Sequence, residues 1–193
     1  MGIYLNPGSD MFQQSLNSMI FVDKSDIIAE LNKIINTNEK YICISRPRRF
    51  GKSMTMNMVS AYYDRTVESS LFAKTKISKT DNYAKHRGAY DVLFINMQNF
   101  LSKTKTMEDL LRLLESRVGR ELVYAYPDID FFDKNSLAYL LEDIYSVTKR
   151  KFVILIDEWD CLFREYQQDK EGQKKYLDFL RSWIKDKDYI ALA

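Results

Sequence analysis

The stretch Y-I-C-I-S-R-P-R-R-F-G-K-S, residues 41–53, decides the fold. Its first four residues are apolar and predict a short buried strand, and a helix is expected to follow the stretch as far as about residue 64. Gly51, Lys52 and Ser53 supply the second half of the phosphate-loop pattern G-x-x-x-x-G-K-[ST]. In such a loop the glycine allows a tight turn, the lysine reaches the β- and γ-phosphates, and the hydroxyl binds Mg²⁺ at the helix N-terminus.

The first glycine of that pattern is missing, because Arg46 stands in its place. The tripeptide therefore has a plainer interpretation, in which Ser53 caps the helix and Lys52 faces solvent. Arg48 and Arg49 add two more cations. These arginines are suited either to contact phosphates or to face solvent and pair with acids elsewhere. A nucleic-acid backbone is a third and weaker candidate, because the net charge of the chain is only +2.

A second motif begins with the apolar run at residues 152–156 and ends in Asp157 and Glu158. Phosphate-loop enzymes place such a strand opposite the loop, with the aspartate supporting Mg²⁺. The adjacent glutamate is suited to act as general base on the attacking water. An Asp-Glu pair that merely caps the next helix is the alternative. Both motifs follow predicted strands, and ligands of open α/β sheets bind at that edge, so together they predict a nucleotide site.

Apolar runs alternate with amphipathic helices along the rest of the chain, which predicts an α/β fold. Continuous apolar strands are typical of a parallel sheet buried on both faces. We therefore expect a three-layer, P-loop-NTPase-like, mostly parallel sheet with helices on both faces. An irregular arm is expected over residues 1–24. The expected strands are 41–44, 91–97 and 152–156, with a fourth beginning in the terminal D-Y-I-A-L-A, and the expected helices are about 25–36, 52–64, 106–126, 135–149 and 171–186.

Four separated segments carry a resemblance to a known family. They are I-Y-L-N-P-G-S-D-M-F with F-V-D-K-S-D-I-I, then C-I-S-R-P-R-R-F-G-K-S, D-V-L-F-I-N-M-Q-N-F and I-L-I-D-E-W-D. In this order they resemble the bacterial AAA-ATPase-like domain of the P-loop superfamily, over about residues 1–193. In that family an arginine at the first-glycine position is usual, and a PD-(D/E)xK nuclease-like domain often follows.

The resemblance implies ATP binding, with probable hydrolysis, and Mg²⁺ as the metal. It implies that Lys52 contacts the β- and γ-phosphates and contributes to catalysis, that Ser53 and Asp157 hold the metal, and that Glu158 is the general base. It also implies that the strand begun by the last residues lies between the Asp-Glu strand and the loop strand. The cofactor-binding set is expected to comprise Arg46, Pro47, Arg48, Arg49, Phe50, Gly51, Lys52, Ser53 and Met54.

Two rival functions remain open at this stage. The first is a module that binds nucleotide without turnover and interacts with a protein partner; the second is a nucleic-acid-binding domain that uses Arg46, Arg48 and Arg49. Sensor residues and an arginine finger are not identifiable, and we expect the chain to be a fragment of a longer protein. Asp23 and Lys24 favour a capping or packing role, although the resemblance implies that their segment lies near the nucleotide.

Composition excludes several classes of protein. Hydrophobic residues make up 46% of the chain and charged residues 29%, which is ordinary globular composition. Two cysteines exclude a disulfide framework, and one histidine leaves too few soft ligands for zinc. Cys43 and Cys161 are expected to be buried or half-buried, and His86 to be solvated. With no leader and no apolar run of membrane-spanning length, we expect a soluble cytoplasmic protein.

Overall fold

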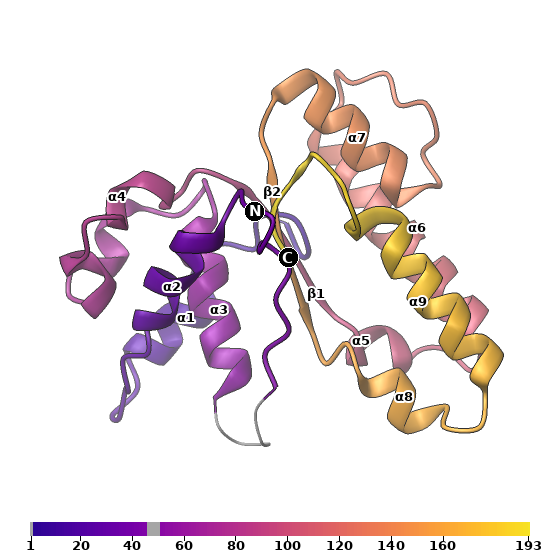
Figure 1. Cartoon of the computed structure of the whole chain (residues 1–193), viewed down its shortest axis with the longest axis horizontal. Helices are drawn as coiled ribbons and strands as arrows, with labels where there is room; N and C mark the ends of the chain where they lie inside the picture. Colours follow the sequence, from indigo (N-terminus) through magenta and orange to yellow (C-terminus); the bar gives the residue numbers. More distant parts are fainter. Residues whose placement is uncertain (1, 46–50) are drawn as a thin grey trace. The chain divides into compact units, whose positions relative to one another are not determined.

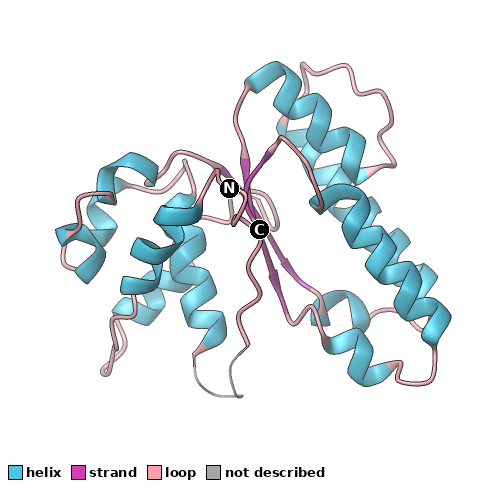
Figure 2. Ribbon diagram, in the orientation of Figure 1, coloured by secondary structure: helices cyan, strands magenta, loops and turns pink. Residues whose placement is uncertain are grey.

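The computed structural model describes residues 2–45 and 51–193. Figures 1 and 2 show helices connected through a small sheet. The strands are β1 (Asp91–Asn96), β2 (Phe152–Asp157) and β3 (Ile190–Leu192). The helices are α1 (Asp10–Leu16), α2 (Asp26–Ile34), α3 (Lys52–Tyr63), α4 (Tyr83–His86), α5 (Gln98–Leu101), α6 (Met107–Ala125), α7 (Leu137–Thr148), α8 (Cys161–Glu165) and α9 (Lys170–Ile184), with 3₁₀ turns η1 (Ser69–Phe72) and η2 (Lys76–Lys79).

The three strands form a parallel sheet in the order β1-β2-β3, with Phe152 of β2 opposite Ile190 of β3. The first four residues of β2 are all buried, and so are the first three of β1. Successive strand residues point to opposite faces, so both faces of these strands are covered. The fold is α/β, as the alternation of apolar runs and helices predicts.

The segment before the glycine-lysine-serine motif differs from the prediction. Residues 41–44 are extended but are not a strand, and Tyr41, Ile42 and Ile44 are 37–42% exposed. Two backbone hydrogen bonds join this segment to Ala193. Ile42 N donates to Ala193 O at 2.8 Å, and Ala193 N donates to Lys40 O at 2.9 Å. A ladder to one residue is too short to make a strand. The segment nevertheless lies beside Ala193, the residue that directly follows β3.

The expectation of an irregular arm over residues 1–24 is also wrong. This segment contains α1, whose Phe12 is only 1% exposed and stacks on Phe72 with a ring separation of 5.0 Å. Ahead of α1, Asn6 is buried and pairs with β1, because its side chain accepts from Val92 N and donates to Asp91, both at 2.7 Å. The segment is therefore fixed by aromatic packing and by side-chain hydrogen bonds, neither of which has a periodic signature.

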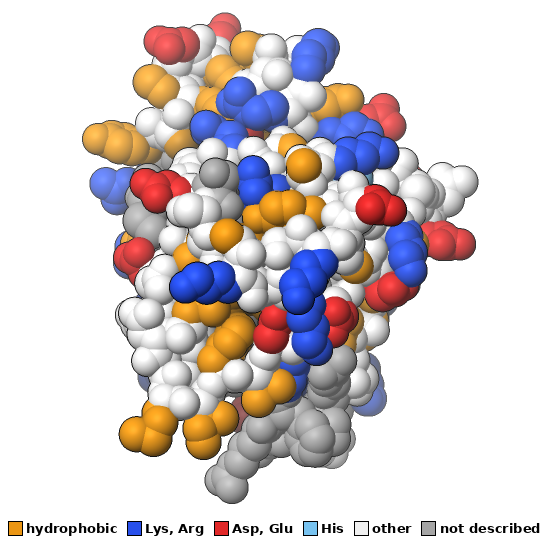
Figure 3. Space-filling model, turned by 90° about the vertical axis from the view of Figure 1, so that its left-hand side faces the viewer, with side chains coloured by type: hydrophobic (Ala, Val, Ile, Leu, Met, Phe, Trp, Pro, Cys, Tyr) orange, Lys and Arg blue, Asp and Glu red, His pale blue; other side chains and the backbone are white. Residues whose placement is uncertain are grey.

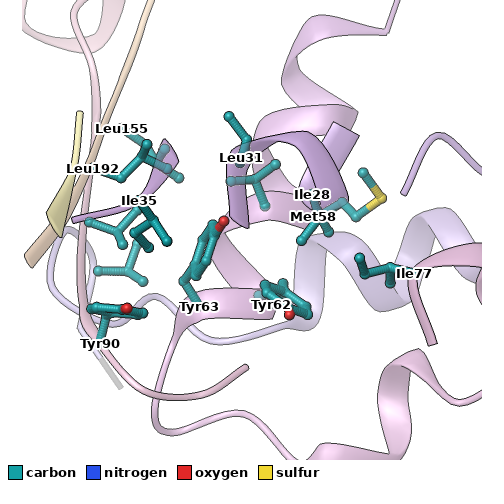
Figure 4. Close-up of a cluster of buried hydrophobic side chains, with 14 of the residues drawn as sticks. Ile28, Leu31, Ile35, Met58, Tyr62, Tyr63, Ile77, Tyr90, Leu155 and Leu192 are labelled. Carbon is teal, nitrogen blue, oxygen red and sulfur yellow. The ribbon is translucent and has the colours of Figure 1, made fainter. Parts of the chain in front are cut away.

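The described residues fall into two compact units. The first takes the residues up to Phe94 together with 152–155 and 190–193, and its core is rich in aromatic side chains. Tyr62 and Tyr63 of α3 meet edge to face at 5.0 Å, among aliphatic side chains of α2 (Figure 4). Asn32 accepts from the Tyr63 hydroxyl and donates to the Tyr62 hydroxyl, both at 2.9 Å. Asn32 thus pairs with the hydroxyl groups of both tyrosines inside the core.

The second unit takes residues 95–151 and 156–189 and is built on α6, α7 and α9. Helix α6 begins as predicted, because the Thr106 hydroxyl accepts from Asp109 N at 3.1 Å. Gly119 lets α7 approach closely, since a Cβ there would lie 3.0 Å from Leu140 Cδ1. Tyr176 and Trp183 of α9 are almost fully buried, as their helical spacing predicts.

Candidate functional site

The start of α3 carries a glycine with positive φ directly ahead of Lys52 and Ser53. Gly51 is the N-cap of the helix and has φ +75°, in the left-handed region that glycine adopts without strain. Its carbonyl accepts from Thr55 N at 2.9 Å and from Thr55 Oγ1 at 3.0 Å. Lys52 and Ser53 are therefore the first two residues of a twelve-residue helix, where the helix dipole favours an anion.

The side chains of this first turn differ in exposure. Ser53 is exposed, whereas Lys52 and Met54 are half-buried. The other predicted cofactor-binding residues, which are Arg46, Pro47, Arg48, Arg49 and Phe50, lie outside the described residues.

The F-V-D-K-S segment lies beside this turn. A Cβ placed on Gly51 would lie 3.3 Å from Lys24 Nζ, so the lysine head group is adjacent to the glycine. Asp23 has the predicted capping role, because its carboxylate accepts from Ser25 N at 2.8 Å and from Lys76 N at 2.7 Å. Burial raises the pKa of Asp23, but these hydrogen bonds outweigh it and hold the pKa below its usual value.

The end of β2 carries the second motif, within residues of the second unit. Asp157 is the last residue of the strand and is 5% exposed. Its Oδ1 accepts from Glu158 N at 3.0 Å, and its carbonyl accepts from Met97 N at 3.0 Å. The carboxylate is thus held at the carboxyl end of the strand, the edge at which parallel sheets bind ligands.

Glu158 has an unusual backbone and a cationic partner. Its φ is +53°, a conformation that costs a residue other than glycine about 1–2 kcal/mol. Its Oε2 lies 2.6 Å from Arg164 Nη2, and Arg164 Nη1 lies 3.0 Å from Asp160 Oδ2. The hydrogen bond to Glu158 is the main reason why the pKa of Arg164 is raised. Sequence analysis missed Arg164, although its four-residue spacing from Asp160 was a readable signal.

Some other predictions can now be judged. His86 was expected to be solvated but is 6% exposed, and its Nδ1 lies 2.8 Å from the Tyr90 hydroxyl; burial lowers the pKa of this histidine. Cys43 is exposed rather than buried, whereas Cys161 is buried, and burial raises its pKa to about 11. Asn96 accepts from Gln98 N at 3.0 Å, which is a loop-stabilising role.

The residues present fit a nucleotide with Mg²⁺. The left-handed Gly51 at the start of α3 suits a phosphate group, and Ser53 and Asp157 carry oxygen atoms of the kind that Mg²⁺ takes as ligands. Among residues 2–45 and 51–193 there is no group of three or more His, Cys, Asp or Glu side chains placed to bind a metal. Mg²⁺ in nucleotide sites is held by one or two carboxylates, the phosphates and water, and needs no such group.

An α/β sheet, a glycine-lysine-serine turn opening a helix and a strand ending in Asp-Glu together define a nucleotide-binding protein of the P-loop type. The family model for a predicted AAA-ATPase, the AAA-ATPase-like family, matches residues 9–189. The chain therefore belongs to the predicted AAA-ATPase family, whose membership indicates nucleotide binding and an ATPase function. No curated protein and no solved structure matches the chain.

The distribution of charged side chains and the character of the helices are relevant to binding of nucleic acid and membranes. On the face shown in Figure 3, basic and acidic side chains are intermixed, in line with the near-balanced charge of the sequence. In the part of the chain that the structure describes, no helix combines the length and apolar character needed to cross a bilayer.

Proposed function

We propose that this chain binds Mg-ATP and hydrolyses it to ADP and phosphate. The observation that carries the proposal is Gly51, whose left-handed backbone opens α3 immediately before Lys52 and Ser53. An ordinary helix N-terminus needs neither a glycine with positive φ nor a lysine and a hydroxyl in its first two positions. Family membership supports the same activity.

Lys52 binds the β- and γ-phosphates and neutralises the charge that develops as the γ-phosphoryl group leaves. In this proposal the N–H groups of Gly51, Lys52 and Ser53 donate to phosphate oxygens, and Met54 follows them in the first turn of α3. Arg46, Pro47, Arg48, Arg49 and Phe50 form the rest of the loop in this proposal.

Ser53 Oγ and the Asp157 carboxylate are the residues that hold Mg²⁺. When bound, Mg²⁺ neutralises phosphate charge and fixes the β- and γ-oxygens for displacement. Asp157 is suited to this role because its buried carboxylate is already oriented by the hydrogen bond from Glu158 N.

Glu158 is the general base. Its carboxylate accepts a proton from the water whose oxygen forms the new bond to the γ-phosphorus, while the bond to the ADP oxygen breaks. Arg164 pairs with this carboxylate at 2.6 Å, so the base is held by a cation in this structure. The ion pair fixes the position of the carboxylate that the proposal makes the base.

Glu158→Gln separates an ATPase from a module that binds nucleotide without turnover. The amide keeps the size of the side chain and removes the base, so we expect phosphate release to fall by about 10²–10⁴-fold. Mg-ATP affinity should stay within about threefold of wild type, because the phosphate contacts remain. Phosphate release under single-turnover conditions and calorimetric titration measure the two quantities.

A matched control is Glu165→Gln, which changes an exposed glutamate of the neighbouring helix α8. It should leave both quantities unchanged. A wild-type chain that binds Mg-ATP without any phosphate release above the Glu158→Gln level would contradict hydrolysis and support the binding module.

A further inference from the structure

We infer that Lys24 supplies a second ammonium group to the phosphates bound at Gly51, Lys52 and Ser53. This inference rests on the proposed function and adds to it a residue from a different part of the chain. The expected ligand class is a nucleoside di- or triphosphate, which carries enough negative charge to take two ammonium groups at one end.

The position of the lysine head group carries the inference. The 3.3 Å between Lys24 Nζ and an ideal Cβ on Gly51 is closer than most contacts that a real Cβ makes. The ammonium group therefore lies against the side of the glycine that any other residue would cover. That glycine directly precedes the first turn of α3, which is the phosphate-binding element of the proposed function.

The backbone that carries Lys24 is fixed on both sides. Ser25 is fully buried, its Oγ accepts from Ile77 N at 3.0 Å, and Ile27 N donates to Lys24 O at 3.2 Å. A lysine on a fixed backbone loses less conformational freedom on binding than one on a mobile loop, because only its side chain must be ordered.

The neighbouring acid is directed elsewhere. Each oxygen of Asp23 accepts a backbone N–H, one from Ser25 and one from Lys76. Lys76 is itself paired with Asp26 at 3.0 Å. Asp23 and Asp26 thus both contact Lys76 of η2. The Lys24 ammonium group lies next to Gly51.

Electrostatics favours a polyphosphate at this place. The partial positive charge at the start of α3 and the Lys52 side chain belong to the same turn, and Lys24 adds a full positive charge next to it. Positive charge gathered at one turn attracts an anion with several negative charges more strongly than an anion with a single charge.

The test is calorimetric titration of Mg-ATP into the full 193-residue chain and into Lys24→Met, Lys24→Arg and Lys52→Ala. Lys24→Met keeps the length of the side chain and removes its charge, and we expect affinity to fall about tenfold. Lys24→Arg keeps the charge, so its affinity for Mg-ATP should fall by less than about threefold. Lys33→Met is the control, because Lys33 is exposed on α2 and paired with Glu30.

Salt dependence distinguishes a phosphate contact from a structural contact with Gly51. If Lys24 touches the phosphates, affinity of Lys24→Met will fall less steeply with added salt than affinity of the wild type. A purely structural role would lower affinity without changing that slope, and this result would overturn the inference, as would unchanged affinity in Lys24→Met.

The outcomes also separate this inference from the proposed function. Loss of binding in Lys52→Ala with no loss in Lys24→Met would overturn the role of Lys24 and leave the phosphate loop intact. No binding of Mg-ATP to the folded wild-type chain would overturn the proposed function itself. Far-ultraviolet circular dichroism and thermal unfolding of each variant identify any that fails to fold.

Discussion

The start of α3 and the end of β2 both use a residue with positive φ, but they use different kinds of residue. At the start of α3 the residue is Gly51, with φ +75°, which glycine adopts at no cost. At the end of β2 it is Glu158, with φ +53°, where the conformation opposes the side chain. The residue at the start of α3 is therefore the type that suits its backbone conformation, whereas the residue after β2 is not.

The difference indicates what each position must keep. At residue 51 the chain keeps a left-handed backbone conformation, and a side chain there would lie close to the Lys24 ammonium group. At residue 158 the chain keeps a carboxylate in spite of the strain. Arg164 pairs with this carboxylate, and Asp157 accepts a hydrogen bond from the backbone nitrogen of Glu158. Strained residues other than glycine are found most often where the side chain has a function, which is consistent with a general base.

Removal of Arg164 tests the ion pair at the end of β2. In Arg164→Ala the Glu158 carboxylate loses the cation that lies 2.6 Å from it, so the carboxylate is no longer held in one position. The rate of ATP hydrolysis should fall by up to about tenfold. Phosphate release at saturating Mg-ATP measures the change.

Arg164→Lys keeps the charge and should restore most of the wild-type rate of hydrolysis. Arg181→Ala serves as a second control, because Arg181 makes an exposed pair with Asp178 on α9. An unchanged rate of hydrolysis in Arg164→Ala would show that the ion pair does not act on the base.

Stability gives a smaller and more discriminating comparison. Gly51→Ala forces a Cβ into a left-handed conformation, so the free energy of unfolding should fall by about 1–2 kcal/mol. Glu158→Gly relieves strain but loses a partly exposed ion pair, and these changes nearly cancel, within about 1 kcal/mol. Chemical denaturation of the two variants and the wild type measures both changes.

Glu158→Gly should nevertheless abolish hydrolysis, because the base is gone. A loss of 2 kcal/mol or more in this variant would contradict the comparison, since it would make Glu158 a structural residue. If Gly51→Ala changes neither the free energy of unfolding nor the affinity for ATP, the left-handed backbone at residue 51 is not required.

The sequence was most informative where a local rule applies. The Thr106–Asp109 capping box gave the start of α6, and the apolar run before Asp157 gave β2 to within a residue. The position of α3 followed from the glycine-lysine-serine turn. These features depend on neighbours in the chain, so they can be recognised without knowledge of tertiary structure.

The sequence was least informative where distant residues decide. Residues 41–44 have strand composition, but the hydrogen bonds that join this segment to Ala193 do not make it a strand. His86 is in a polar stretch, but Tyr90 and the surrounding fold bury it. The contact of Lys24 with Gly51 and the hold of Arg164 on Glu158 depend on side-chain placement, which spacing in a sequence only hints at.

The central claim is that Gly51, Lys52 and Ser53 bind the phosphates of ATP, and calorimetric titration with Mg-ATP tests it most directly. We predict saturable binding to the wild-type chain and binding weakened at least tenfold in Lys52→Ala, with Lys33→Ala unchanged. If Lys52→Ala is folded and binds Mg-ATP as tightly as the wild type, the claim is wrong.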